Sequence, residues 1–338
     1  MLFALKKKLM GGVIAKRNRQ KPFDFRSAEE FSLKGTEDPI VNNSYYFSAH
    51  DGVMSFYARL GRRTSMEETW VALFLGGRMY SLKQETFPAG ESPLKVEKSG
   101  DNWTVSYRGI LNDADEVDFR ATFMAVQPPV DFTTDMPSER MAAGLANEKW
   151  SKALFKGLQT ISGQCHYEQE GVLEGILTLN GEKKEFRLPC VRDHSFGNRD
   201  WNYMNNHLWL MAVGESFQFN YSMVSYPVMS VLEVGNYRDA EGQHYLKRAG
   251  LDLRQAGTGS VPGRLDFEVT LDNMRTIPVS AKVLDGVTYH FQEGQYILHE
   301  NIAEFTIDGK VCRGILEIGF NGDNSRIFNQ RNLTEIRR

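Results

Sequence analysis

Short runs of alternating apolar and polar residues, each ended by a turn signal, extend from about Asn43 toward the end of the chain. A period of two is typical of a strand with one buried face. The even spacing of the runs favours a sandwich or barrel over βαβ units. Asn180-Gly181, between two such runs, indicates a two-residue hairpin turn. An aromatic content of 12% agrees with a strand-rich chain. We therefore expect an all-β protein.

One segment, residues 137–162, breaks this rhythm with apolar residues at helical spacing, and Ser138 can cap its first turn. At 338 residues the chain is long enough for two domains of average size. The flanking halves each offer enough strands for a barrel of about eight, a size that holds one small ligand. We expect two tandem antiparallel β-barrels, at 36–136 and 163–338, joined by a helical linker at 137–162.

The first 35 residues form a separate lead-in, and the first 17 of them interleave apolar residues with lysine and arginine. This pattern lacks the continuous apolar region and cleavage site of a secretory signal. It fits a basic amphipathic helix on an anionic lipid surface, and it equally fits a leader that packs locally. No run of residues approaches the ~18 apolar residues of a membrane span. We expect a cytoplasmic protein, with peripheral membrane contact through residues 1–17 as an open alternative.

Composition and short motifs limit the kinds of partner, metal site and cofactor that we expect. The net charge of -3 leaves no global basic field for nucleic acid. Cys165, Cys190 and Cys312 are odd in number and lack CxxC spacing, so we expect buried thiols in a reducing compartment rather than disulfides or a zinc site. The chain has no dinucleotide-binding glycine motif, no P-loop and no GxSxG elbow. We therefore expect no cofactor and no metal ion; oligomeric state is not predicted.

Residues 191–201 read Val-Arg-Asp-His-Ser-Phe-Gly-Asn-Arg-Asp-Trp and place five charged or titratable side chains between apolar strands. On a strand, Arg192 and His194 share one face and Asp193 takes the other, until Gly197 permits a bend. Charges in a sheet are costly unless they are paired, so one interpretation is a structural ion-pair cluster. The other is catalysis, in which a carboxylate fixes one tautomer of His194 and its second nitrogen exchanges a proton.

Aromatic and polar side chains near this segment are candidates for a ligand site. Trp201 and Trp209 offer flat apolar walls for an unsaturated or ring-bearing molecule. Trp209 shares one strand face with His207 and Met211, and a strand that faces a core has the same pattern. Catalytic candidates are Asp193 and His194; candidates for substrate binding are Arg192, Asn198, Arg199, Trp201, Trp209 and Tyr221.

The segment from Arg192 to Trp201 resembles an Arg-Asp-His-Ser-aromatic-Gly-x-Arg-x-Trp signature of tandem lipocalin-like (calycin) proteins. This superfamily includes the carotenoid 1,2-hydratase (hydroxyneurosporene synthase) family and related pericyclase and Diels–Alderase enzymes. His166-Tyr167-Glu168-Gln169 and the segment 303–317 support the likeness, which covers roughly residues 160–320. The resemblance implies a ligand site inside or between two barrels, for isoprenoids, polyketides or other lipophiles.

In the hydratase branch an Asp-His pair and nearby aromatics occupy this segment, which corresponds to Asp193, His194 and Trp201. This chain departs from the pattern by placing Arg192 before the pair. A neighbouring cation favours an ionised carboxylate, which argues against alkene protonation by Asp193. Two functions remain open: cofactor-independent acid–base chemistry on a lipophile, of hydratase, isomerase or cyclase type, or non-enzymatic lipid binding or transfer with a purely structural cluster.

Overall fold

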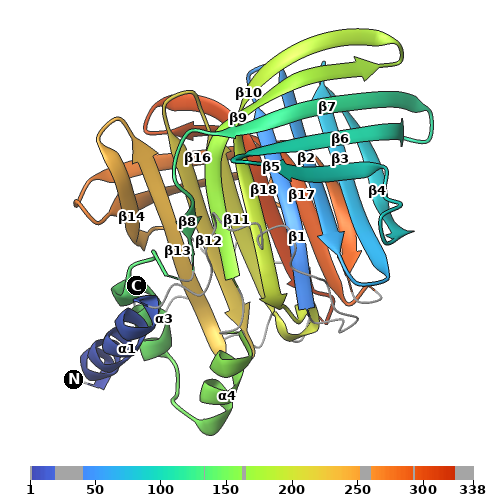
Figure 1. The fold of residues 1–338 in the computed structure, drawn as a ribbon. Helices are drawn as coiled ribbons and strands as arrows, with labels where there is room; N and C mark the ends of the chain where they lie inside the picture. Colours follow the sequence, from blue (N-terminus) through green and yellow to red (C-terminus); the bar gives the residue numbers. More distant parts are fainter. Residues whose placement is uncertain are drawn as a thin grey trace.

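The computed structural model describes residues 2–19, 41–132, 134–161, 165–251, 260–291 and 294–323. Most of these residues lie in antiparallel strands, in two sheets (Figure 1). The first sheet contains β1 (Val41–His50), β2 (Met54–Arg62), β3 (Met66–Leu75), β4 (Arg78–Pro88), β5 (Leu94–Ser99), β6 (Asn102–Leu111), β7 (Asp115–Ala125), β8 (Val130–Asp131), β9 (Cys165–Leu179) and β10 (Glu182–Asn198). The second contains β11 (Asn206–Val213), β12 (Gln218–Tyr226), β13 (Met229–Asp239), β14 (Gly242–Ala249), β15 (Arg264–Leu271), β16 (Thr276–Phe291), β17 (Tyr296–Ile307) and β18 (Lys310–Asn321).

The second sheet closes into a barrel, because β18 returns to pair with β11. Alternation along its strands fills the interior: Leu208 and Leu210 belong to the barrel core, whereas Trp209 between them points outward. This half confirms the predicted barrel of eight strands. The three cysteines are free thiols, and Cys165 and Cys190 are buried as expected.

The first sheet is open, so the prediction of two closed barrels is wrong for this half. Its strand order is β4-β3-β2-β1-β10-β9-β7-β6-β5, and β4 and β5 at the two ends form no ladder with each other. The sheet curls around its own apolar core, and the turn between β6 and β7 meets β4 instead. The backbone N–H of Asn112 donates to the carbonyl of Ser81 at 3.1 Å, and Arg78 pairs with Asp115 at 2.8 Å. Among the described residues, side chains and one turn therefore join this end of the sheet to the turn after β6, where no strand ladder forms.

The predicted linker is also misplaced. It forms two helices, α3 (Ser138–Asn147) and α4 (Lys152–Ile161), and Ser138 begins α3 without capping it. Both helices lie between β8 and β9, which pair with each other in the first sheet. The strands of residues 165–198, assigned from sequence to the second domain, thus complete the first sheet through the pairings of β9 with β7 and of β10 with β1. The short 3-10 helix η1 (Trp201–Tyr203) lies between the strands of the two sheets.

A third apolar cluster fills the seam between the outer faces of the sheet and the barrel. Strand β1 of the sheet packs on β18 of the barrel there, and the two layers overlap in the view of Figure 1. At the centre of the seam, Trp70 of β3 stacks on Tyr289 of β16, with ring centroids 4.0 Å apart and an angle of 8° between the planes. The two units are therefore packed against each other through large aromatic side chains.

The leader forms the helix α1 (Leu2–Asn18), and one face of this helix packs locally. Met10 and Ile14 are buried, and they pack in one cluster with Ala142 and Leu145 of α3. The rest of the predicted lead-in and the expected domain start at residue 36 lie outside the described residues. Within the described ranges, no helix combines the length and the hydropathy needed to cross a bilayer.

Candidate functional site

A cavity of about 170 Å³ lies in the seam, so it belongs to neither interior. Strands β1, β2, β3, β9 and β10 of the sheet and β11, β12, β17 and β18 of the barrel contribute to its walls. Its lining residues are Ser44, Tyr46, Arg59, Trp70, His166, Asp193, Ser195, Arg199, Trp201, Met204, His207, Trp209, Ser222, Val224, Tyr226, Leu298 and Glu317.

On the sheet side, Asp193 and His166 form an ion pair. Asp193 points into the seam from β10, and its Oδ2 lies 2.5 Å from Nε2 of His166 on the neighbouring strand β9. Burial alone would lower the pKa of His166, but the charges of Asp193 and Glu168 outweigh it and raise the pKa to about 10. His166 is therefore a cation at neutral pH, with its side chain 26% exposed.

Glu168 connects the two units behind this pair. It is fully buried on β9 and accepts hydrogen bonds from Trp209 Nε1 at 3.0 Å and from Asn220 Nδ2 at 2.6 Å, both in the barrel. Its Oε1 also lies 3.7 Å from His166 Nε2. Burial raises the pKa of Glu168 above its ordinary value. These contacts hold the β9 side of the cavity against β11 and β12.

On the barrel side, Glu317 of β18 pairs with His207 of β11 through a short contact. His207 Nδ1 in turn lies 2.6 Å from the hydroxyl of Tyr296. Burial alone would raise the pKa of Glu317, but His207 and Arg199 outweigh it and hold the pKa below its ordinary value. Glu317 therefore stays a carboxylate at neutral pH.

A second, neutral carboxyl group lies behind Glu317. Glu300 is its cross-strand partner on β17 and accepts a short hydrogen bond from the hydroxyl of Tyr46. Burial and the neighbouring Glu317 raise the pKa of Glu300 well above its ordinary value. Two adjacent carboxyl groups thus hold different protonation states, as in sites that exchange protons.

Arg199 lines the same cavity and lies over the ring of Trp201, at 5.4 Å from the centroid. Burial lowers the pKa of Arg199 and the charge of Asp193 partly offsets this, but a guanidinium stays charged at neutral pH. Among the described residues, no hydrogen bond or ion pair to the Arg199 side chain is formed. A cation placed this way offers its donors to a negatively charged or carbonyl oxygen of a ligand.

The predicted Asp193–His194 pair is not formed. The alternation expected on β10 is confirmed, and it directs His194 into the interior of the first sheet, away from Asp193. There His194 stacks on Tyr45 at 4.2 Å and hydrogen-bonds the Tyr167 hydroxyl and Asn43 Oδ1, each at 3.0 Å. Burial lowers its pKa well below the ordinary value, so this imidazole is neutral. Its surroundings are those of a structural residue.

Arg192 also points into that interior, so it does not charge the surroundings of Asp193 as expected. Its guanidinium lies 4.5 Å from the centroid of Trp103 and donates to the Tyr167 hydroxyl at 3.1 Å and to Gln169 Oε1 at 2.7 Å. Tyr221 is likewise misassigned to the ligand, because it faces the barrel core and donates to Glu233 at 2.7 Å.

The remaining residues predicted to bind substrate differ in whether they line the cavity. Trp201 and Trp209 both line the cavity, as does Arg199. Asn198 pairs in register with Val41, and its side chain lies outside the described part of the structure. Of the residues proposed from sequence, the structure therefore brings together Asp193, Arg199, Trp201 and Trp209.

Sequence reasoning missed both histidines of the site. His166 belongs to the segment that supports the family resemblance, and His207 lies on the strand face of Trp209; these were the available signals. Glu317 ends the segment 303–317, which also supports the resemblance. Each of the three finds its partner on another strand, and such registers are not visible in the sequence.

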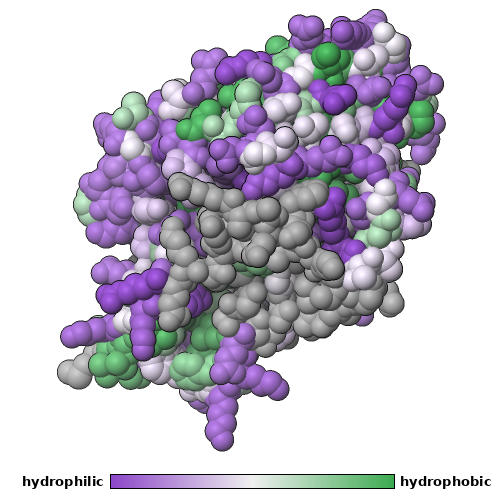
Figure 2. Space-filling model, in the orientation of Figure 1, coloured by the Kyte–Doolittle hydropathy of each residue, from purple (hydrophilic) through white to green (hydrophobic). Residues whose placement is uncertain are grey.

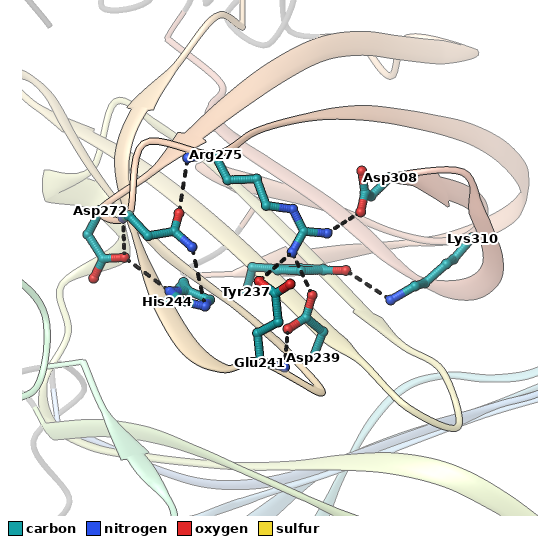
Figure 3. Close-up of polar contacts among 9 residues, drawn as sticks. Tyr237, Asp239, Glu241, His244, Asp272, Arg275, Asp308 and Lys310 are labelled. Atoms are coloured by element: carbon teal, nitrogen blue, oxygen red, sulfur yellow. Dashed lines mark hydrogen bonds and ion pairs between the residues drawn. The ribbon is translucent and has the colours of Figure 1, made fainter.

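One further group could offer metal ligands. Potential ligand atoms of Asp239, Glu241 and His244 lie within 4.8 Å of one another. Figure 3 shows Arg275 directed at the two carboxylates, with Nη1 at 2.8 Å from Asp239 and 3.4 Å from Glu241, and with Asp308 as a further partner. The guanidinium already supplies the positive charge that these carboxylates need, so the group does not fit a cation.

The arrangement of sheet and barrel is shared with solved structures. A crystal structure of an AttH-like protein from Nitrosomonas europaea matches with 14% identity and a TM-score of 0.59, covering 88% of this chain and 97% of that one. Kievitone hydratase from Nectria haematococca matches with 12% identity and a TM-score of 0.53, covering 84% and 90%. CghA with Sch210972 gives a TM-score of 0.45 at 8% identity, covering 85% and 89%. At these identities the likeness shows the fold.

These findings confirm the coarser part of the resemblance, because the fold is shared with a hydratase. A specific place in the carotenoid 1,2-hydratase branch stays a prediction. None of the curated proteins compared matches the chain. A family model described as "Domain of unknown function (DUF7064)" matches residues 33–322, and the chain therefore belongs to the DUF7064 family.

Proposed function

We propose that this protein binds a small, ring-bearing molecule with a carbonyl or phenol oxygen in the seam cavity and transfers protons on it without a cofactor. The observation that carries the proposal is the convergence of two carboxylate–histidine pairs, one from each unit, on a single cavity. His166–Asp193 comes from the sheet and His207–Glu317 from the barrel. Paired titratable groups with shifted pKa values in a cavity are typical of acid–base sites.

The size of the cavity limits the ligand. An engineered cavity of about 150 Å³ in another protein holds one benzene molecule. A cavity of about 170 Å³ therefore has room for one ring with short substituents, and a complete carotenoid or long isoprenoid chain exceeds this volume. Trp70, Trp201 and Trp209 supply flat walls suited to such a ring.

The charges suggest a division of roles. Glu317, held ionised by His207, would accept a proton from a carbon next to the carbonyl group. Arg199 and the His166 cation would bind the oxygen on which negative charge then develops. If the substrate has a conjugated double bond, Glu317 returns the proton to its far carbon, which completes an isomerisation. If the substrate has a hydroxyl group on the β-carbon, its C–O bond breaks as the new double bond forms, and the hydroxyl group leaves as water with the proton that Glu317 accepted. That dehydration is the reverse of a hydratase step.

In the alternative function, the protein carries lipids and the charged cluster is purely structural. Only Arg192 and His194 agree with a structural role, because they point away from the cavity. A carrier for whole lipids needs a larger and less charged cavity than this one. Acid–base conversion of a small molecule therefore agrees better with the geometry.

Hydrogen–deuterium exchange tests the proposal without knowledge of the natural substrate. The probe is para-hydroxyacetophenone, which combines one ring, a phenol oxygen and an enolisable methyl group. In deuterium oxide, we expect the protein to accelerate the loss of its methyl proton signal in NMR. Glu317→Gln should slow this exchange roughly a hundredfold, the usual effect of one acid–base group. Glu304→Gln, exposed on the same pair of strands, is the matched control and should have no effect.

Binding is measured separately through tryptophan fluorescence. Arg199→Gln should weaken binding of the probe roughly tenfold, the effect of one charged hydrogen bond, and should leave binding of ethylbenzene, which has no oxygen, unchanged. The proposal fails if exchange in the presence of the protein equals that in buffer, or if Glu317→Gln exchanges as fast as the unchanged protein.

A further inference from the structure

The helix α1 presents an apolar stripe to solvent. Leu2, Leu5, Leu9 and Val13 are between 53% and 66% exposed and follow one another at helical spacing. The opposite face of the helix is buried against α3. The stripe is therefore not needed for the packing of α1, and exposed apolar rows of this kind mark interaction sites.

The charge beside this stripe has one sign. Residues 2–18 contain five lysine or arginine residues and no aspartate or glutamate, in a chain with a net charge of -3. Lys8 and Lys16 are exposed on α1. This local positive charge contrasts with the net negative charge of the chain and complements an anionic surface.

A second patch with the same character lies at the start of α4. Phe155 is 42% exposed and packs edge-on against Trp150, and Lys149, Lys152 and Lys156 are exposed around them. Like α1, residues 149–161 contain no acidic residue. Tryptophan and lysine are typical of segments at a membrane–water interface, where the ring lies among headgroups and the lysine extends into water.

The two patches lie at the same end of the molecule. Lys6 of α1 links them, because its Nζ donates to the carbonyl of Glu148 at 2.5 Å and lies 5.4 Å from the centroid of Trp150. Figure 1 shows α1 and α4 projecting below the sheets, and Figure 2 shows hydrophobic side chains over both helices with hydrophilic chains extending beside them.

We propose that α1 and the start of α4 form a docking surface for a bilayer that contains anionic lipids. At such a surface the exposed leucines would enter the boundary between headgroups and acyl chains, and the neighbouring lysines would pair with anionic headgroups. A second copy of the chain fits the surface less well, since a symmetric contact would bring two acid-free, lysine-bearing faces together. The proposal is independent of the chemistry in the cavity.

Docking at this surface would also fix the orientation of the cavity relative to the bilayer. A Cβ on Gly157 of α4 would lie 2.7 Å from the hydroxyl of Tyr203, so α4 packs directly on η1. Tyr203 stacks on Tyr226, which lines the cavity together with Trp201. Helix α4, which begins in the proposed surface, therefore reaches the wall of the cavity through Tyr203 and Tyr226.

Co-sedimentation with vesicles tests the surface in the full-length protein. We expect stronger binding to vesicles of phosphatidylcholine with phosphatidylserine than to phosphatidylcholine alone, and weaker binding at high salt. Leu5→Glu with Leu9→Glu should reduce binding roughly tenfold or more. Lys8→Gln with Lys16→Gln should reduce it about fivefold per lysine, and only on anionic vesicles.

The control is Val311→Glu, at an apolar residue on β18 that is even more exposed than the two leucines, and this variant should bind as the unchanged protein does. Thermal melting of each variant tests whether it is folded. We expect the leucine variants to fold normally, because both leucines of α1 face solvent. The proposal is overturned if the protein binds neither vesicle, if it binds both equally, or if the leucine variants bind unchanged. A dimer that the leucine variants dissociate, without vesicle binding, would assign the surface to a second copy.

Discussion

The ion pair between Asp193 and His166 predicts a specific dependence of stability on pH. The pKa of His166 is raised from its ordinary value of 6.5 to about 10 in the folded protein. A raised pKa in the folded state contributes stability that is complete below pH 6.5 and is lost as the pH rises through about 10. Asp193→Asn removes the nearer carboxylate and should therefore remove most of this pH dependence.

The magnitude follows from the pKa difference. At about 1.4 kcal/mol per pKa unit, the shift corresponds to an upper limit of about 5 kcal/mol below pH 6.5. The side chain of His166 is 26% exposed, so solvent screens part of this energy, and Glu168 remains 3.7 Å away in the variant. We expect Asp193→Asn to lower the free energy of unfolding by about 2–3 kcal/mol near neutral pH, within the range for broken ion pairs.

Urea denaturation at several pH values between about 6 and about 10 measures the effect. The difference between the variant and the unchanged protein should be largest at the acidic end and shrink toward the alkaline end. Asp118→Asn serves as the control, because its ion pair with Arg108 is exposed and should contribute no measurable stability at any pH. A difference that stays constant across this pH range would refute the assignment of His166 as the charged partner.

Two further substitutions separate structure from chemistry. His194→Ala removes the ring that stacks on Tyr45 and should lower the free energy of unfolding by about 2–4 kcal/mol. Exchange of para-hydroxyacetophenone protons should remain intact. Loss of exchange at unchanged stability would instead assign His194 to the catalytic site. Gly319→Ala would place a Cβ 2.6 Å from His207 Nδ1, so we expect a cost of about 1–3 kcal/mol, measured in urea, and loss of exchange as His207 leaves Glu317; normal exchange in that variant would show that this pair is dispensable.

The sequence predicts local geometry well in this chain. Alternation placed Arg192 and His194 on one face of β10 and Asp193 on the other, and the structure confirms it. A closed barrel in the C-terminal half was also predicted, although with the strands of residues 165–198 included, and a leader helix was one of two interpretations left open.

Pairings between distant strands account for the errors. Nothing local shows that β10 pairs with β1, about 150 residues earlier, so residues 165–198 were assigned to the wrong half. The same limitation hid the partner of Asp193. His194 is adjacent in sequence but opposite in direction, whereas His166 is distant in sequence and adjacent in space.

The aromatic stack of Trp70 on Tyr289 acts as a spacer between sheet and barrel, and this has a consequence for how such proteins diversify. Trp70 itself lines the cavity, whereas Tyr289 stacks behind it and is not a lining residue. A change in the bulk of Tyr289 therefore alters the separation of the two units and the width of the cavity, while the acid–base groups remain on their strands. Relatives with the same architecture can thus acquire ligands of other sizes through substitutions that never touch the ligand, and comparison of lining residues alone would overlook them.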